Sequence, residues 1–158
     1  MAIKKHHLSL DDTFEETFHL LAIYSNLEAY RMAFVLNKTL DLNLIKTVSI
    51  HRKKEGAEFD VYEFSDPDYY RSWLLLHNYA FVQTKQSTVD LFSQDAIFEQ
   101  KLVYHKELKK APFLLKIIAD INSAFLQNTV HKLQKHPLIY TVDLIDITQL
   151  KNQKLLIF

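Results

Sequence analysis

Apolar side chains recur with helical spacing between positions 25 and 44, and this range is predicted to form a helix. Placed at about 100° per residue, its apolar residues cover roughly 220° of the helical wheel, more than the stripe of a typical surface helix. We therefore expect a helix buried on most sides, with one thin exposed seam. The apolar arc contains Leu27, Ala29, Tyr30, Met32, Ala33, Phe34, Leu36 and Leu40, and the seam contains Glu28, Arg31, Val35, Lys38 and Thr39. Ser25 and Glu28 have the spacing of a capping box at the start of this helix.

Shorter apolar or alternating segments predict the strands of a sheet. They span residues 3–10, 17–24, 47–52, 58–64, 69–78, 81–84, 89–92 and 138–145. Segments 47–52 and 58–64 are predicted to form a hairpin, in which Gly56 adopts a positive φ at the tip. A short helix that begins at Pro67 is the alternative for 69–78. Residues 151–158 predict a polar turn followed by an apolar tail that packs on the sheet.

Residues 112–134 are compatible with two structures. In the first, Leu114, Ile117 and Phe125 belong to one long helix that begins at Pro112. In the second, residues 113–119 form a strand, residues 120–123 cap a helix, and that helix continues to residue 134. With the strand, 17–52 and 113–145 are both strand–helix–strand units. This predicts an α+β fold with a mainly antiparallel sheet and two principal helices, and ferredoxin-like βαβ units are our working hypothesis.

The composition is that of a folded globular chain. Its 158 residues fit one domain, which we assign to residues 1–158, and 48% of them are apolar. Nineteen basic and nineteen acidic residues give a formal net charge of zero, which argues against nucleic-acid binding through phosphate neutralisation. No apolar run approaches the length of about 18 residues that crosses a bilayer. We therefore expect a cytoplasmic protein that does not bind a membrane.

Several residue types that carry chemistry are missing or badly spaced. The chain has no cysteine, which excludes disulfides, thiolate zinc sites and cysteine nucleophiles. A single glycine, Gly56, excludes glycine-rich phosphate-binding loops. Among the eight histidines, His131 and His136 are five residues apart and would lie on different faces of a helix. We expect no enzyme, no catalytic residues, no metal and no other cofactor.

Both ends of the chain carry motifs of a known family. The run Leu27-x-x-Tyr30-Arg31, followed by Leu36-Asn37-Lys38-x-Leu40-x-Leu42-x-Leu44, resembles the helix L-x-D-Y-R-L-x-W-x-L-N-K-x-L-x-L-x-L of the uncharacterised bacterial IPExxxVDY family. Residues 150–158 are similar to the closing L-K-x-K-x-N-L-I-F of that family. The motif that gives the family its name would fall on residues 105–113, where Glu107 is identical and Phe113 replaces tyrosine. The middle of the chain matches poorly.

The resemblance implies a cytoplasmic α+β protein and supplies no activity. In the family, the motif leads into a strand of the type Y-F-L-K-I, which matches residues 113–117 of this chain. The resemblance therefore favours the strand over the long helix at 113–119.

Five residues are predicted to contribute to a binding site. Asn37 lies inside the apolar arc, where an unpaired amide costs free energy, so its side chain either ties neighbouring backbone or faces a pocket. Arg31 either pairs on the helix surface or anchors an anionic partner. Tyr30 suits a core or an interface, and Lys38 lies on the exposed seam. Glu107 joins this set through the family motif.

Three functions fit the sequence, and none is an enzyme. The leading hypothesis is a non-enzymatic protein that binds a protein partner or forms a homo-oligomer, motivated by the missing catalytic motifs and the 13% of aromatic residues. The first alternative is a ferredoxin-like domain that senses a small anionic metabolite near Arg31 and Asn37. The second is an RNA-associated protein whose basic residues lie beside Tyr69, Tyr70 and Trp73. Those basic residues are His51, Arg52, Lys53, Lys54, Lys106, Lys109 and Lys110.

Overall fold

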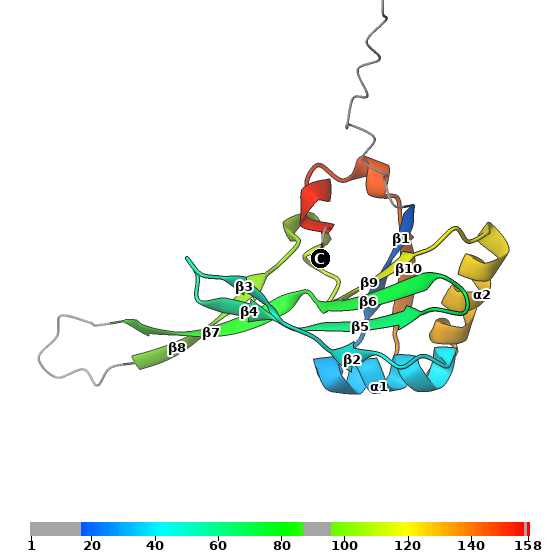
Figure 1. Ribbon diagram of the computed structural model, residues 1–158. Coiled ribbons are helices and arrows are strands. Elements are labelled where there is room, and N and C mark those ends of the chain that lie inside the picture. The colour runs from blue at the N-terminus through cyan, green and yellow to red at the C-terminus, as the bar shows by residue number, and fades with distance from the viewer. Residues whose placement is uncertain (1–16, 87–95, 157) are drawn as a thin grey trace, which may run out of the picture.

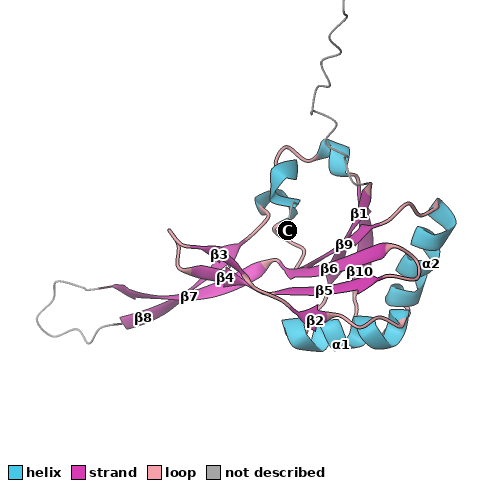
Figure 2. Ribbon diagram, viewed as in Figure 1, coloured by secondary structure: helices cyan, strands magenta, loops and turns pink. Residues whose placement is uncertain are grey.

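The largest element of the structure is a six-stranded antiparallel sheet with two helices on one face (Figures 1 and 2). The computed structural model describes residues 17–86, 96–156 and 158. In spatial order the strands are β10 (Thr141–Ile145), β1 (Phe18–Tyr24), β9 (Phe113–Ile118), β6 (Arg71–His77), β5 (Val61–Asp66) and β2 (Ile45–Lys46). The helices are α1 (Ala29–Leu40) and α2 (Ser123–Gln134). The predicted α+β class is confirmed.

Two separate hairpins and three short helices complete the described part of the chain. The hairpins pair β3 (Ile50–Arg52) with β4 (Ala57–Phe59) and β7 (Tyr79–Gln86) with β8 (Ala96–Val103). The 3-10 helices are η1 (Lys106–Leu108), η2 (Ile147–Gln149) and η3 (Gln153–Leu156). The β7–β8 hairpin extends away from the sheet, whereas the three short helices lie close to it (Figure 1).

Four central strands form a ferredoxin-like arrangement. Strands β9 and β10 both pair antiparallel with β1, so they run parallel to each other on its two sides, and α2 connects them. Strand β6 pairs with the other side of β9 and runs parallel to β1, and α1 lies between β1 and β6 in sequence. The order β10-β1-β9-β6 therefore contains two split β-α-β units. Strands β2 to β5 are an insertion in the first unit, and β7–β8 is an insertion between the units.

The first unit differs from its sequence prediction, which ended it with a strand at 47–52. Strand β2 has only the exposed residues Ile45 and Lys46 and lies at the sheet edge, while β3 pairs with β4 outside the main sheet. The strand beside β9 is β6, whose residues from Trp73 to Leu76 are all buried. A central strand covered on both faces needs such a continuous apolar run, and 47–52 has none.

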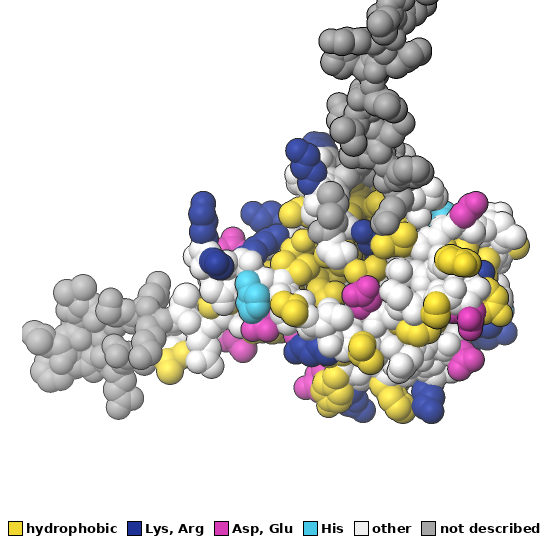
Figure 3. Space-filling view, viewed as in Figure 1, with side chains coloured by type: hydrophobic (Ala, Val, Ile, Leu, Met, Phe, Trp, Pro, Cys, Tyr) yellow, Lys and Arg dark blue, Asp and Glu magenta, His cyan; other side chains and the backbone are white. Residues whose placement is uncertain are grey.

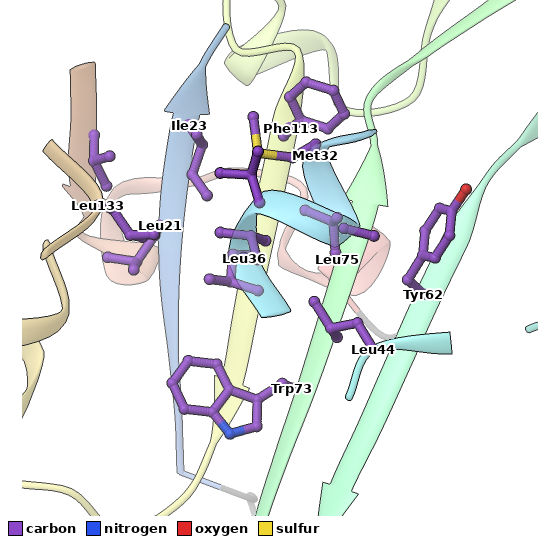
Figure 4. Close-up of a cluster of buried hydrophobic side chains, with 14 of the residues drawn as sticks. Leu21, Ile23, Met32, Leu36, Leu44, Tyr62, Trp73, Leu75, Phe113 and Leu133 are labelled. Carbon is purple, nitrogen blue, oxygen red and sulfur yellow. The ribbon is translucent and has the colours of Figure 1, made fainter. Parts of the chain in front are cut away.

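The core on the helix face is built from alternate strand residues that contact α1 and α2. Figure 4 shows Met32 and Leu36 of α1 among side chains from β1, β6 and β9. These strand side chains include Leu21, Ile23, Trp73, Leu75 and Phe113. Helix α2 begins after Asn122, whose side chain accepts a hydrogen bond from the amide of Phe125 at 2.8 Å. The cap fixes the helix start where the second of the two predicted structures for 112–134 places it.

A second apolar cluster covers the other face of the sheet. It combines Leu20, Ala22, Val61, Leu76 and Leu114 of the sheet with Ala57, Phe59, Ala80, Tyr104, Ala111 and Leu156. Lys116 of β9 points into this side and is 7% exposed, and its Nζ donates a hydrogen bond to the carbonyl of Leu156 at 2.8 Å. The same ammonium lies 5.5 Å from the ring centroid of Phe158. The predicted packing of the apolar tail on the sheet is confirmed.

Helix α1 is less buried than its sequence predicts. Tyr30 and Phe34, placed in the apolar arc, are each 61% exposed, whereas Val35, placed on the exposed seam, is buried. The reason is that, within the described part of the chain, the sheet and α2 cover one side of the helix, so the buried stripe is centred on Met32 and excludes the far side of the predicted arc.

The ends of α1 also differ from their prediction. The helix begins at Ala29 without a side-chain cap, because the Ser25 hydroxyl donates to the carbonyl of Leu138 at 2.7 Å and accepts from the amide of Leu27. The capping box between Ser25 and Glu28 is therefore wrong. The helix ends at Leu40, since Asp41 adopts a left-handed conformation with φ of 56°.

Most other strand predictions are confirmed. The observed strands β1, β6, β9 and β10 correspond to the predicted segments 17–24, 69–78, 113–119 and 138–145, so the helical alternatives for 69–78 and for 112–134 are wrong. The hairpin with Gly56 at its tip is β3–β4, and Gly56 has φ of 62°. Strand β8 was not predicted. The predicted strands at 3–10 and 89–92 lie outside the described residues.

Candidate functional site

The exposed face of α1 carries three of the predicted binding residues. Tyr30, Arg31 and Lys38 are all exposed, and the Lys38 ammonium lies 5.7 Å from the ring centroid of Phe34. A hydrogen bond with the Glu28 carboxylate raises the pKa of Tyr30 above its ordinary value. These side chains form an aromatic and basic surface on α1.

Asn37 ties the end of α1 to the chain that follows it. Its Nδ2 donates to the carbonyl of Leu44 at 3.2 Å, and its Oδ1 accepts from the amide of Leu44 at 2.7 Å. The carbonyl of Asn37 also accepts a hydrogen bond from the amide of Leu42. The side chain of Asn37 was predicted either to bind neighbouring backbone or to face a pocket, and the structure shows that it binds the backbone of Leu44. The side chain holds Leu44 in the core just before β2.

Glu107 of η1 binds a segment distant in sequence. Its two carboxylate oxygens accept hydrogen bonds from the amides of Lys151 and Asn152, both at 3.0 Å. The bond from Lys151 is the main reason that the pKa of Glu107 lies below its ordinary value, and the bond from Asn152 acts in the same direction. Glu107 therefore anchors the segment that leads into η3.

The structure does not bring the five predicted binding residues together. Tyr30, Arg31, Asn37 and Lys38 belong to α1 on one face of the sheet, whereas Glu107 lies beside the cluster on the other face. The small-metabolite hypothesis needs a pocket at Arg31 and Asn37. Among the described residues, one surface hollow is lined by residues 151–155 and another by Phe18, His19 and residues 144–147, and neither includes these side chains.

The residues of the RNA hypothesis are also separated. Lysine and arginine side chains gather over the β3–β4 turn and the nearby η1 and η3 (Figure 3). Tyr69 and Tyr70 lie in the turn between β5 and β6, which is at the other end of these two strands from β4 and the arm. Trp73 is buried in the core on the helix face of the sheet. The three aromatic residues that the hypothesis names therefore do not lie beside the basic side chains.

The β7–β8 hairpin, which we call the arm, exposes apolar side chains on both of its faces. Phe81 and Ile97 project from one face and are 56% and 60% exposed, and Phe98 projects from the other and is 53% exposed. The arm extends away from the sheet (Figure 1), and β4 packs against β7 near the base of the arm. This surface was not predicted from the sequence. Large apolar residues at both 97 and 98 were the available signal, because one of two consecutive strand residues faces away from any single core.

Asn78 fixes the base of the arm to the domain. It is fully buried, its Nδ2 donates to the carbonyls of Leu108 and Ala111, and its Oδ1 accepts from the amide of His105 at 2.8 Å. Its backbone carbonyl accepts from the amide of Tyr104 at 2.8 Å. These bonds hold both strands of the arm and the η1 segment in one arrangement, so the direction in which the arm projects is fixed.

Arg52 of β3 braces the same region. Its guanidinium lies 5.3 Å from the ring centroid of Phe59 and 5.0 Å from that of Tyr104, and it donates to the carbonyls of Val103 and Tyr104. Burial raises the pKa of Tyr104, and the charge of Arg52 opposes this shift. Arg52 is thus committed to the base of the arm and does not belong to the exposed basic turn predicted around it.

The described residues, 17–86, 96–156 and 158, also bear on other kinds of site. In this part of the chain, no group of three or more histidine or carboxylate side chains is arranged to hold a metal ion. His105 is fully buried, and its two ring nitrogens have no hydrogen-bond partner among the described residues. Among the same residues, no helix is long and apolar enough to cross a membrane.

Comparison of the chain with protein-family models, curated proteins and solved structures gives no match. The resemblance to the IPExxxVDY family therefore stays a prediction. Two of the segments that carry it do meet in the structure, since Glu107 binds the backbone of Lys151 and Asn152.

Proposed function

We propose that this is a non-enzymatic protein that acts by self-association through its β7–β8 arm. The observation that carries the proposal is the exposure of Phe81, Ile97 and Phe98 on a hairpin that projects from the domain. The predicted cytoplasmic location and the family membership belong to the same proposal, and the cysteine-free composition is compatible with a reducing compartment.

The physics of an isolated hairpin supports this function. A two-stranded ribbon is marginally stable in water unless a third strand or another surface covers it. Its outer edges present unpaired amide and carbonyl groups, to which a further strand can add. Burial of each exposed phenylalanine or isoleucine against a second molecule would contribute about 1.5–3 kcal/mol. A contact along the arm therefore stabilises both the arm and the assembly.

The two alternatives have weaker support. The amide of Asn37, which the metabolite hypothesis placed in a pocket, is occupied by the backbone of Leu44. The RNA hypothesis relied on Trp73, which is buried, and on Arg52, which holds the base of the arm. The exposed lysines that remain do not distinguish a nucleic-acid site from an ordinary solvated surface.

Light scattering after size-exclusion chromatography tests the proposal on the full chain. We expect the mean mass to rise with protein concentration toward twice 18.7 kDa. The double variant Phe81→Ser, Phe98→Ser should shift this rise to at least tenfold higher concentration, because it removes one apolar side chain from each face of the arm.

The matched control is Tyr70→Ser, which removes an aromatic ring that is 91% exposed in the β5–β6 turn. It should leave the mass curve unchanged. If Tyr70→Ser shifts the curve as much as the arm variant does, the self-association does not depend on the arm. A mass of 18.7 kDa at every concentration would overturn the proposed function.

A further inference from the structure

The outer edge of β8 presents backbone groups from alternate residues. The amide of Tyr104 donates to the carbonyl of Asn78, and the same register pairs Tyr79 with Val103 and Val82 with Gln100. Hydrogen-bonded and non-bonded pairs alternate along an antiparallel ladder. The even-numbered residues of β8 therefore bond to β7, and the amides and carbonyls of Ile97, Glu99 and Lys101 point away from it.

Arg52 marks the end of this open edge. It donates to the carbonyl of Val103, which confirms that odd-numbered carbonyls of β8 point outward. It also covers the edge next to the domain. Among the described residues, the backbone groups that remain for another strand on this edge are those of Ile97, Glu99 and Lys101.

The charged residues on this edge of β8 are complementary to those on the same edge of a second copy. Glu99 and Lys101 are exposed and project from the same face of β8, on either side of Gln100. If two copies of β8 pair antiparallel with Gln100 on the two-fold axis, Glu99 of each copy lies opposite Lys101 of the other. Phe98 then lies opposite Leu102. Opposite charges and apolar pairs at directly opposed positions stabilise antiparallel strands.

The neighbouring registers lack this complementarity. A two-fold axis at Glu99 places two glutamates opposite each other, and an axis at Lys101 places two lysines opposite each other. Like charges at directly opposed positions are destabilising. The Lys101 ammonium lies 3.3 Å from the centroid of the Tyr79 ring, on the same face of the arm as Glu99.

We infer that the partner of the arm is a second copy of this chain, joined edge to edge through antiparallel β8 strands with Gln100 on the two-fold axis. This inference rests on the proposed function. In the pair, the outward amides and carbonyls of Glu99 and Lys101 bond across the axis, and the two arms become one four-stranded sheet in the order β7-β8-β8-β7. A closed two-fold contact of this kind ends at a dimer.

Disulfide trapping tests the register, because the chain has no cysteine of its own. In the inferred pair, residue 100 faces its own copy at a non-hydrogen-bonded position, where Cα atoms are about 4.5 Å apart. That distance lies at the short end of the range of about 4.4–6.8 Å that disulfides span. Gln100→Cys should form a covalent dimer under mild oxidation. The matched control, Gln83→Cys, is exposed on β7 and should stay monomeric on a denaturing gel.

Charge exchange tests the same pairing without a new bond. Glu99→Lys and Lys101→Glu should each raise the dimer dissociation constant about tenfold, because each places like charges opposite one another twice. The double variant Glu99→Lys, Lys101→Glu restores opposite charges and should return to the wild-type value. Additive loss in the double variant would overturn the inferred register.

The outcomes separate this inference from the function on which it rests. If the wild-type chain dimerises but Gln100→Cys links no faster than Gln83→Cys, the β8 pairing is wrong and self-association stands. If the wild-type chain stays monomeric, the proposed function and the pairing are both overturned.

Discussion

Asn37 and Leu44 are joined by two hydrogen bonds that together close the loop after α1. The Asn37 amide nitrogen donates to the Leu44 carbonyl and its oxygen accepts from the Leu44 amide, as a neighbouring strand would. Leu44 is buried and directly precedes β2, the last strand on one edge of the sheet. Asn37, a polar residue in the apolar arc of α1, therefore positions the backbone of Leu44, which lies only seven residues away in the sequence.

Replacing Asn37 should lower stability. Asn37→Leu leaves the amide and carbonyl of Leu44 without these partners in a partly buried position, so we expect a loss of about 1–3 kcal/mol in the free energy of unfolding. Urea denaturation followed by circular dichroism measures it. Asn43→Leu, at an exposed position in the same loop, is the control and should change stability by less than about 0.5 kcal/mol. Equal stability of Asn37→Leu and the wild type would show that this tie is dispensable.

Lys116 should hold the η3 segment on the sheet. Lys116→Met removes the donor to the Leu156 carbonyl while keeping most of the side-chain volume, and we expect a loss of about 2 kcal/mol. Hydrogen exchange of a peptide that covers 153–156 should become faster. Lys54→Met, at the exposed β3–β4 turn, should alter neither quantity. Unchanged exchange in Lys116→Met would refute the role of this lysine.

Glu107 predicts a pH dependence. Its pKa lies below the ordinary value of 4.5 because the amide of Lys151 binds the ionised form. A lowered pKa means that the stabilisation is fully present above 4.5 and is lost as the pH falls through the lowered value. The difference in thermal midpoint between wild type and Glu107→Gln should therefore be constant near neutral pH and shrink in acid. Glu58→Gln, exposed on β4, is the control. A difference that grows in acid would contradict the assignment.

Arg52 should not be replaceable by lysine. The guanidinium lies against two aromatic rings and donates to two carbonyls, and an ammonium cannot reproduce this planar arrangement. We expect Arg52→Lys to cost about 1–2 kcal/mol in the free energy of unfolding. Lys53→Arg, in the exposed turn beside it, should have no effect on the urea midpoint. A neutral Arg52→Lys would mean that the stacking and the paired donation do not stabilise the base of the arm.

The strands and helices that bury one or both of their faces in the core were the elements most predictable from the sequence. Strands β1 and β10 place apolar residues where the sheet core needs them, and their patterns predict them. The pattern of 112–134 also fits one long helix, and the family resemblance, not the pattern, favoured the strand that is β9. The arm was only half predicted, because exposed residues on both faces leave no alternation to detect. Helix α1 was correctly placed but its exposed side was not, since Tyr30 and Phe34 are apolar residues that face water.

The contacts that organise the candidate site were less predictable, because their partners are distant in sequence. Asn37 was singled out for its place in an apolar arc, and its partner is nearby. Asn78 and Lys116 were not, and Arg52 was named only as part of a basic turn, since their carbonyl partners lie 30 or more residues away. Composition and periodicity do not show which distant backbone groups will become the hydrogen-bond partners of a polar side chain when the intervening chain folds back.

Amide hydrogen exchange, resolved by residue, tests the edge-to-edge dimer most directly. At concentrations where the mass is that of a dimer, the amides of Glu99 and Lys101 should exchange at least tenfold more slowly than at dilutions where the chain is monomeric. The amide of Gln83, which points outward on the opposite edge of the arm, should exchange at the same rate in both. Equal, fast exchange of Glu99, Lys101 and Gln83 in the dimer would contradict pairing through β8.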